Sequence, residues 1–345
     1  NSRMNSFLGN TQTQTVHLPY DAMIHEARTP DTKNGAQTGF YPGGEYIFQK
    51  HFTAPQAWQG KPVSLVFEGV YQTALVYLNG WLLTRNVNGY AEFTVEAGPY
   101  LKYVADNLLK VIADNSLEPN SRWYTGSGIY RPVRLLVGNK VYLPQDTVRI
   151  TTREADEGFA LLDVTAQVQS ASTVTERVTL QQTICREGTA VLTDRQNLLL
   201  QPGESRTVSF RYCVDSPALW SPENPNLYTS TMQVLEGEEE LDREETGFGI
   251  RTLSIDAAHG VRINGQTVKL RGACIHHDNG ILGAATLPDA EERRIRQLKE
   301  AGFNAIRSSH HPAGRALLDA CDRYGVLVMD ELSDVWNVRK NPYDY

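Results

Sequence analysis

The sequence has few cysteines, no concentrated basic segment and no long hydrophobic run. Its four cysteines, in 345 residues, form no CxxC pair, which argues against a zinc site and against a disulfide framework. Cys185 and Cys213 could bond only if their strands are neighbours, so one disulfide stays open. The 33 Lys and Arg residues are dispersed and outnumbered by 40 acidic residues, so we expect no nucleic-acid partner. No window approaches the ~20 apolar residues of a membrane-spanning helix, so no membrane is expected.

Short runs of alternating apolar and polar residues dominate the sequence from residue 16 to residue 250. Many short strands with no helical period predict antiparallel β-structure. A first series predicts a jelly-roll β-sandwich over residues 1–143, with strands at residues 63–67, 74–78, 109–113 and 133–137. A second series predicts an immunoglobulin-like β-sandwich over residues 144–250, with strands at residues 148–150, 161–168, 178–184, 208–212 and 227–234.

The pattern changes after Gly260, where strands begin to alternate with helices. Strands are predicted at residues 268–271, 303–307 and 326–330, and helices at residues 288–301 and 314–324. Asp289 and Glu292 have the spacing of a capping box at the start of the first helix. Alternation of this kind predicts βαβ units and a parallel sheet. We therefore expect a mostly β, multidomain chain that ends with the first part of a (β/α)8 TIM barrel over residues 251–345, about three strands and incomplete.

Five segments, taken in order, resemble glycoside hydrolase family 2. They are WYTGSGIYR at residues 123–131, WSPENPNLY at 220–228, GFGIR at 247–251, LRGACIHHD at 270–278 and FNAIRSSH at 303–310. The resemblance implies a jelly-roll sugar-binding domain, an immunoglobulin-like domain and a TIM-barrel catalytic domain. It also implies a fragment of a retaining exo-β-glycosidase, β-galactosidase-like, that hydrolyses terminal β-D-galactosides by double displacement.

Retaining hydrolysis needs two carboxyl groups roughly 5–5.5 Å apart. By the family pattern, the acid/base glutamate follows the fourth barrel strand and the nucleophile follows the seventh. We therefore expect no catalytic residue in this chain and no turnover by this chain alone.

The candidate site residues follow the predicted barrel strands, because reacting groups of a TIM barrel sit at the C-terminal ends of its strands. The resemblance assigns sugar hydrogen bonding to His276 and His310. Asp278 and Arg307 are further substrate-binding candidates, although Arg307 could equally hold a neighbouring carboxylate. Asp114 matches a jelly-roll aspartate that reaches the barrel mouth in some family members, and an ordinary Asp-Asn turn is the alternative.

Other residues are expected to support the site rather than to bind or react. His277, Asp330 and Glu331 belong to this group, and the acidic pair precedes the strands that carry the family's catalytic glutamates. Trp336 is either a sugar-stacking platform or a buried tryptophan at the barrel rim. Three residues of the signature segments are expected in the core or at domain interfaces: Trp123, Arg131 and Trp220.

No metal and no other cofactor is expected. Residues 332–337 lack the glutamate and the histidine that bind a divalent cation in some β-galactosidases, and the segment looks like the metal-independent branch found in host-associated bacteria. The expected ligand is the terminal β-galactoside of an oligosaccharide or glycan. Family members often pack through their β domains, so a homo-oligomer stays open. The location also stays open between the bacterial cytoplasm and an extracytoplasmic compartment, periplasmic or secreted.

Two other functions compete with this interpretation. A β-glucuronidase of the same family shares the scaffold, and the residues that recognise its uronate carboxylate would lie after residue 345. A non-catalytic carbohydrate-binding module would present exposed aromatic residues in a flat row, and it would have no use for the βα pattern after Gly260.

Overall fold

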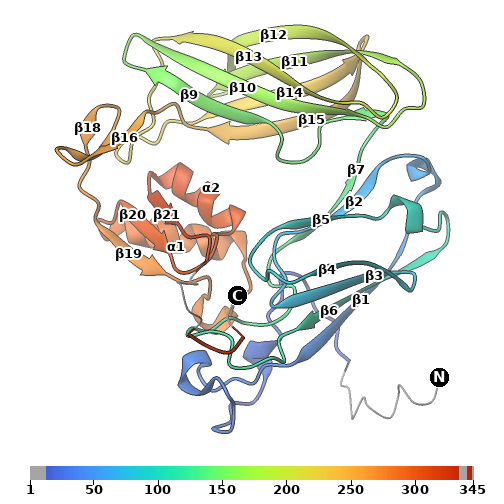
Figure 1. Ribbon diagram of the computed structural model, residues 1–345. Helices are drawn as coiled ribbons and strands as arrows, with labels where there is room; N and C mark the ends of the chain where they lie inside the picture. The colour runs from blue at the N-terminus through green and yellow to red at the C-terminus, as the bar shows by residue number, and fades with distance from the viewer. Residues whose placement is uncertain (1–12, 334–339, 344–345) are drawn as a thin grey trace.

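The computed structural model describes residues 13–333 and 340–343, which form two β-sandwiches and a smaller α/β unit (Figure 1). The immunoglobulin-like sandwich lies at the top of the view, the jelly roll at the lower right and the α/β unit at the lower left. This arrangement confirms the predicted mostly β, multidomain fold with the start of a TIM barrel. Neither α-helix in the described ranges is long and apolar enough to cross a membrane.

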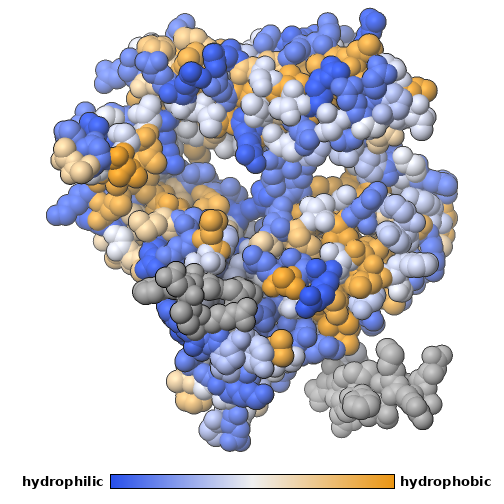
Figure 2. All heavy atoms as spheres, in the orientation of Figure 1, coloured by the Kyte–Doolittle hydropathy of each residue, from blue (hydrophilic) through white to orange (hydrophobic). Residues whose placement is uncertain are grey.

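The first sandwich packs two antiparallel sheets face to face. One sheet has the order β1-β6-β3-β4 and the other β5-β2-β7. Their inward residues, such as Phe67, Val76 and Val111, form one core. Figure 2 shows apolar residues gathered over this lower-right unit, and the exposed apolar residues of β1 and β4 include Ile47, Trp81 and Leu82. The strands are β1 (Glu45–Thr53), β2 (Val63–Phe67), β3 (Thr73–Leu78), β4 (Trp81–Asn86), β5 (Phe93–Glu96), β6 (Asp106–Asp114) and β7 (Val133–Val137).

The second sandwich is built from longer strands. Its sheets have the orders β13-β10-β8, with β9 beside β10, and β12-β11-β14-β15. The sequence did not predict β12, because its middle, residues 193–197, is polar and exposed on both faces. Cys185 and Cys213 lie on β11 and β13, in different sheets, and all four cysteines are free thiols. The strands are β8 (Val141–Tyr142), β9 (Arg149–Ala155), β10 (Phe159–Ser170), β11 (Glu176–Arg186), β12 (Thr189–Leu200), β13 (Ser205–Asp215), β14 (Tyr228–Glu236) and β15 (Glu239–Phe248).

The α/β unit contains the parallel sheet β19-β20-β21. Ile295 of α1 and Leu317 of α2 pack with Ile306 of the sheet in a separate core. A small antiparallel sheet connects this unit to the second sandwich and consists of β16 (Leu253–Asp256), β17 (Gly260–Ile263) and β18 (Gln266–Thr267). The elements of the α/β unit are β19 (Gly272–Ile275), α1 (Pro288–Glu300), β20 (Ala305–Ser308), α2 (Arg315–Tyr324) and β21 (Leu327–Asp330).

Two local predictions in this unit are wrong. The first parallel strand begins at Gly272, after the predicted strand at residues 268–271, where the Val268 N–H still donates to the Val261 carbonyl. Small residues suit β19, because a Cβ at Gly272 would lie 3.0 Å from the Ala305 carbonyl oxygen. The capping box is also absent: the N-cap of α1 is Leu287, with no side-chain cap, because Pro288 takes the first helical position.

The second sandwich contacts the end of α2 through the WSPENPNLY segment. Trp220 is buried, and its Nε1 donates to the Asp322 carbonyl oxygen at 2.9 Å. Lys299 donates to the carbonyl oxygens of Pro222 and Gly325. Gly325 ends α2 with φ +69°, and a Cβ there would collide with the Pro222 carbonyl oxygen. Trp220 therefore lies at a domain interface, where the sequence analysis expects it.

Replacing Gly325 with alanine should destabilise the chain by about 3 kcal/mol in urea unfolding. About 1–2 kcal/mol comes from the left-handed backbone conformation, and the remainder comes from the collision with Pro222. Gly203→Ala is the matched control, because Gly203 has φ +70° but no atom lies within 4 Å of the position that a Cβ would take there. Equal losses for the two variants would contradict the close approach of α2 to Pro222.

Candidate active site

His276 and His310 lie side by side beyond the C-terminal ends of two parallel strands. His276 follows β19 and His310 follows β20, and their ring centroids are 5.6 Å apart. The register pairs Ile275 with Ser308, so both strands end at the same edge of the sheet. The structure thus brings together the two histidines that the sequence analysis assigns to sugar binding.

Trp123 of the jelly roll contacts both imidazole rings. Its ring is nearly parallel to His276, at 17° and 5.7 Å, and lies 5.0 Å from the ring of His310. Its Nε1 donates to the Tyr90 hydroxyl at 3.0 Å, which holds the indole in place. Trp123 is therefore an interface residue, as expected, and it also adds an aromatic face to the histidine pair. In the sequence, Trp123 was marked only by the WYTGSGIYR segment, and that segment does not indicate which residues Trp123 contacts.

Glu331, just after β21, connects Arg307 and His310. Its carboxylate accepts from Arg307 Nε at 2.6 Å and lies 3.2 Å from His310 Nδ1. The hydrogen bond to Glu331 raises the pKa of Arg307, whereas burial lowers the pKa of His310 against the pull of Glu331. Of the two roles open to Arg307, the contacts match the one in which it holds a carboxylate. Asp330 instead accepts from the Ala313 N–H at 2.9 Å.

His277 points away from the histidine pair and is buried against the jelly roll. Its Nε2 donates to the Thr125 carbonyl oxygen at 2.8 Å, and its Nδ1 lies 2.9 Å from His311 Nε2. With both rings neutral, His311 donates the hydrogen bond between them. The Pro312 carbonyl oxygen lies 3.1 Å from His311 Nδ1, which carries no proton in this tautomer, and it accepts its hydrogen bond from Arg131 Nη2 at 2.8 Å. His311 was not predicted from the sequence, because no local pattern marks a buried partner for His277.

Asp21, which was also not predicted from the sequence, stabilises the same interface between the jelly roll and the α/β unit. It is 1% exposed and accepts hydrogen bonds from the Met23, Ser127 and Ala284 N–H groups and from the Tyr124 hydroxyl. Gly126 passes over it with φ +67°, where a Cβ would lie 2.5 Å from the Ala284 Cβ. The signature segment therefore needs glycine for a close approach to the barrel.

The remaining candidates are less closely connected with the histidine pair. In the described residues Asp114 accepts hydrogen bonds only from Ser116, through its N–H and hydroxyl, which is the geometry of a local turn. The carbonyl oxygen of Asp278 accepts from Arg294 at 2.6 Å. Trp336 lies outside the described residues. No group of three or more His, Cys, Asp or Glu side chains arranged for a metal ion occurs in residues 13–333 and 340–343, and the expectation of a metal-independent site stays a prediction.

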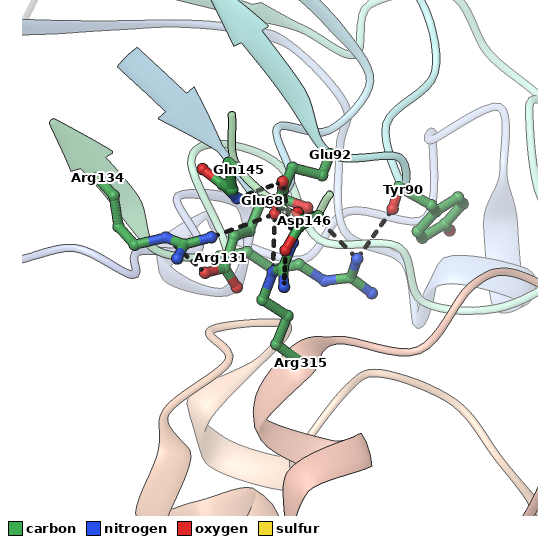
Figure 3. Close-up of polar contacts among 8 residues, drawn as sticks. All are labelled: Glu68, Tyr90, Glu92, Arg131, Arg134, Gln145, Asp146 and Arg315. Atoms are coloured by element: carbon green, nitrogen blue, oxygen red, sulfur yellow. Dashed lines mark hydrogen bonds and ion pairs between the residues drawn. The ribbon is translucent and has the colours of Figure 1, made fainter. Parts of the chain in front are cut away.

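A network of charged residues ties Arg315, at the start of α2, to both sandwiches (Figure 3). Arg315 makes two hydrogen bonds to Glu92, at 2.9 and 3.0 Å, and also contacts Asp146. Arg134 reaches Glu68 at 3.3 Å and Glu92 at 3.5 Å, and Gln145 donates to Glu92 at 2.8 Å. Because Arg315 is 41% exposed, this network orients the units more than it stabilises them.

The side chains around His276 and His310 suit a hydroxyl-rich ligand. Two imidazoles offer hydrogen-bonding nitrogens, Trp123 offers an apolar face, and Glu331 with Arg307 adds a fixed charge pair. A few convergent polar groups beside an aromatic surface are typical of small-molecule sites.

The buried pair His277 and His311 should make stability depend on pH. Burial lowers the pKa of His311 to about 3 and that of His277 well below the ordinary value of 6.5. Between about pH 3 and pH 6.5 the unfolded chain binds more protons than the folded chain. The free energy of unfolding should therefore fall as the pH drops below 6.5.

The slope of unfolding free energy against pH, from urea titrations between pH 4.5 and pH 7.5, measures this effect. A His277→Asn/His311→Asn double variant should give a shallower slope, whereas the exposed His17→Asn control should keep the slope of the original chain. An unchanged slope in the double variant would show that the pair is not neutral in the folded state.

Known proteins match this chain along nearly its whole length. Three family models match in order: "Glycosyl hydrolase 2 galactose-binding domain-like" over residues 14–159, "Glycosyl hydrolases family 2" over residues 141–251, and "Glycosyl hydrolases family 2, TIM barrel domain" over residues 257–340. The β-galactosidase BoGH2A of Bacteroides ovatus is 38% identical over 333 residues, which are 96% of this chain and 39% of that protein.

Solved structures give the same result. A glycosyl hydrolase family 2 member from Bacteroides cellulosilyticus superposes with a TM-score of 0.93 at 36% identity, covering 98% of this chain and 44% of that one. A Bacteroides uniformis β-glucuronidase superposes with a TM-score of 0.85 at 28% identity, covering 96% and 40%. This chain thus spans less than half the length of these relatives. The order of the matched domains and the identity to BoGH2A together place the chain in family 2 of the glycosyl hydrolases.

Proposed function

We propose that the protein containing this chain is a retaining exo-β-glycosidase that removes terminal β-D-galactosyl residues from an oligosaccharide or glycan. The observation that carries the proposal is the pairing of His276 and His310 at one strand edge, beneath the indole of Trp123. The similarity to a protein named β-galactosidase supports galactose as the sugar.

In this proposal the chain binds and orients the sugar, and the catalytic pair lies elsewhere in the protein. His276 and His310 hydrogen-bond sugar hydroxyls, and the ring of Trp123 packs on the apolar side of the sugar. Glu331 holds the His310 ring through Nδ1 and is itself held by Arg307. The family pattern assigns the acid/base and nucleophile glutamates to the fourth and seventh barrel strands, after the three strands of this chain. The reaction then proceeds through a covalent glycosyl-enzyme intermediate.

The other candidate residues are proposed to lie at the edge of the sugar site, to support it, or to hold the domain interface. Asp278 and Asp114 are assigned to the edge of the sugar site, and Arg307, Asp330 and Glu331 to its support. His277 keeps the jelly roll against the barrel and does not reach the sugar, because both of its nitrogens are engaged in the interface. For Trp336 both alternatives stay open, a platform on which the sugar stacks or a buried tryptophan at the barrel rim.

β-Glucuronidase is the second candidate, favoured by the similarity to the Bacteroides uniformis β-glucuronidase. A carbohydrate-binding module without catalytic activity is less consistent with the βαβαβ unit and with a histidine pair at its strand ends.

Steady-state hydrolysis of 4-nitrophenyl β-D-galactoside and β-D-glucuronide by the full-length gene product tests the proposal. We expect the galactoside to be hydrolysed with the higher kcat/KM, and this chain alone to give no turnover. His276→Ala and His310→Ala should each lower kcat/KM by about 10- to 100-fold, which corresponds to one lost hydrogen bond to a buried hydroxyl. His51→Ala, a change at a histidine 65% exposed on the jelly roll, is the control.

The outcomes separate the candidates. A higher kcat/KM for the glucuronide would show that the substrate is a glucuronide, while the proposed retaining hydrolysis would stand. Turnover of neither substrate, or full activity in both histidine variants, would overturn the proposed site.

A further inference from the structure

Arg294 of α1 lies beneath the segment that carries His276. Its side chain is 15% exposed, and its two terminal nitrogens donate to different carbonyl oxygens. Nη1 donates to His276 at 2.8 Å and Nη2 donates to Asp278 at 2.6 Å. One guanidinium therefore bridges the peptide group between residues 276 and 277 and the peptide group between residues 278 and 279.

These carbonyl groups need a partner because the chain has just left the sheet. β19 ends at Ile275, so the carbonyls of His276 and Asp278 are beyond the ladder of β20. A planar guanidinium can satisfy two acceptors in fixed directions, whereas an ammonium acts as a point charge. Arg294 thus fixes the 276–277 peptide plane, one of the two between which the His276 side chain projects, and ties it to the peptide plane that follows Asp278.

The surroundings of Arg294 tolerate its charge. The Glu291 carboxylate, on the same helix, is 3% exposed and lies 3.6 Å from Arg294 Nη1. Burial raises the pKa of Glu291, and Arg294 opposes that shift. Both residues and His276 line one internal cavity of about 10 Å³, which leaves room for about one water molecule.

The His276 ring is not anchored through its own inner nitrogen. Its Nδ1 is buried and has no hydrogen-bond partner in the described part of the chain. Stacking on Trp123 fixes the plane of the ring but leaves it able to slide. The position of the imidazole therefore depends on the backbone that Arg294 holds.

We propose that Arg294 is a positioning residue that acts through His276: by holding the carbonyls of His276 and Asp278, it sets the imidazole in the orientation that receives a sugar hydroxyl. The proposal rests on the proposed function, and it adds a residue that touches neither the sugar nor the reacting atoms.

The test compares Arg294→Lys with the original full-length protein, alone and in a His276→Ala background. The lysine keeps the charge and most of the length but holds the two carbonyls less rigidly. We expect Arg294→Lys to lower kcat/KM by about tenfold, mainly through a higher KM, and to have less than a twofold effect once His276 is alanine. Arg296→Lys is the matched control, since Arg296 is an exposed arginine on the same helix with its side chain 54% exposed.

Each outcome has one meaning. A purely structural role for Arg294 would give the same loss in both backgrounds, and that result overturns the proposal. Wild-type kcat/KM in Arg294→Lys overturns it as well. Should the lysine variant fail to fold, by its urea midpoint, Arg294→Gln serves in the same cycle, because its amide can still donate to one carbonyl. Absence of turnover by the original protein overturns the proposed function, and this inference falls with it.

Discussion

The arrangement depends on one buried polar interface, between the WYTGSGIYR segment of the jelly roll and the chain that follows β19 and β20. His277 donates to Thr125, Arg131 donates to Pro312, and Asp21 accepts from Ala284. Each of these groups is removed from water, so separating the units within a dry interface would leave donors and acceptors unpaired at about 1–3 kcal/mol each. Polar pairing therefore helps to define how the jelly roll sits on the barrel strands, beside the apolar cluster of Tyr90, Tyr130 and Ala284.

The same interface explains why the candidate site is composite. The barrel strands end at the surface that the jelly roll covers, so side chains projecting from those ends meet side chains of the signature segment. Trp123 is placed on His276 and His310 in this way, while Tyr90 stacks on His311 at 4.1 Å immediately beside them. The jelly roll is consequently part of the wall of the site, and its orientation affects the geometry of the histidine pair.

The immunoglobulin-like sandwich influences the candidate site indirectly, through α2. It contacts the far end of α2 through Trp220 and Pro222, whereas the start of α2 is held to the jelly roll by Arg315. The end of the helix is thus fixed by the second sandwich, and its start is fixed by both sandwiches, because Arg315 also contacts Asp146 between β8 and β9. Since α2 packs against Ile306 and the strand sheet, the two sandwiches together hold the sheet that carries the site.

Much of the fold follows from the sequence because local periodicity reports which face of a segment is buried. The alternating runs identified both sandwiches, and the later helical runs identified α1 and α2 to within a residue or so at most ends. The grouping of His276 with His310 also followed, since parallel strands in one sheet end at one edge. β12 was missed because its middle, residues 193–197, is polar and exposed, and β19 was missed because most of its residues are small.

The residues that only the tertiary structure could identify are those whose partners are distant in the chain. Asp21 meets Ala284, Thr125 meets His277, and Trp123 meets His310, each across more than a hundred residues. Arg294 is nearer to His276 in sequence, yet the helical pattern presents it as one more charged residue on α1. A hydrogen-bonding side chain carries no local sign of its partner, whereas an apolar face is marked by its own neighbours. The sequence by itself therefore determined the elements and their order, and the packing of the three units decided which polar groups meet.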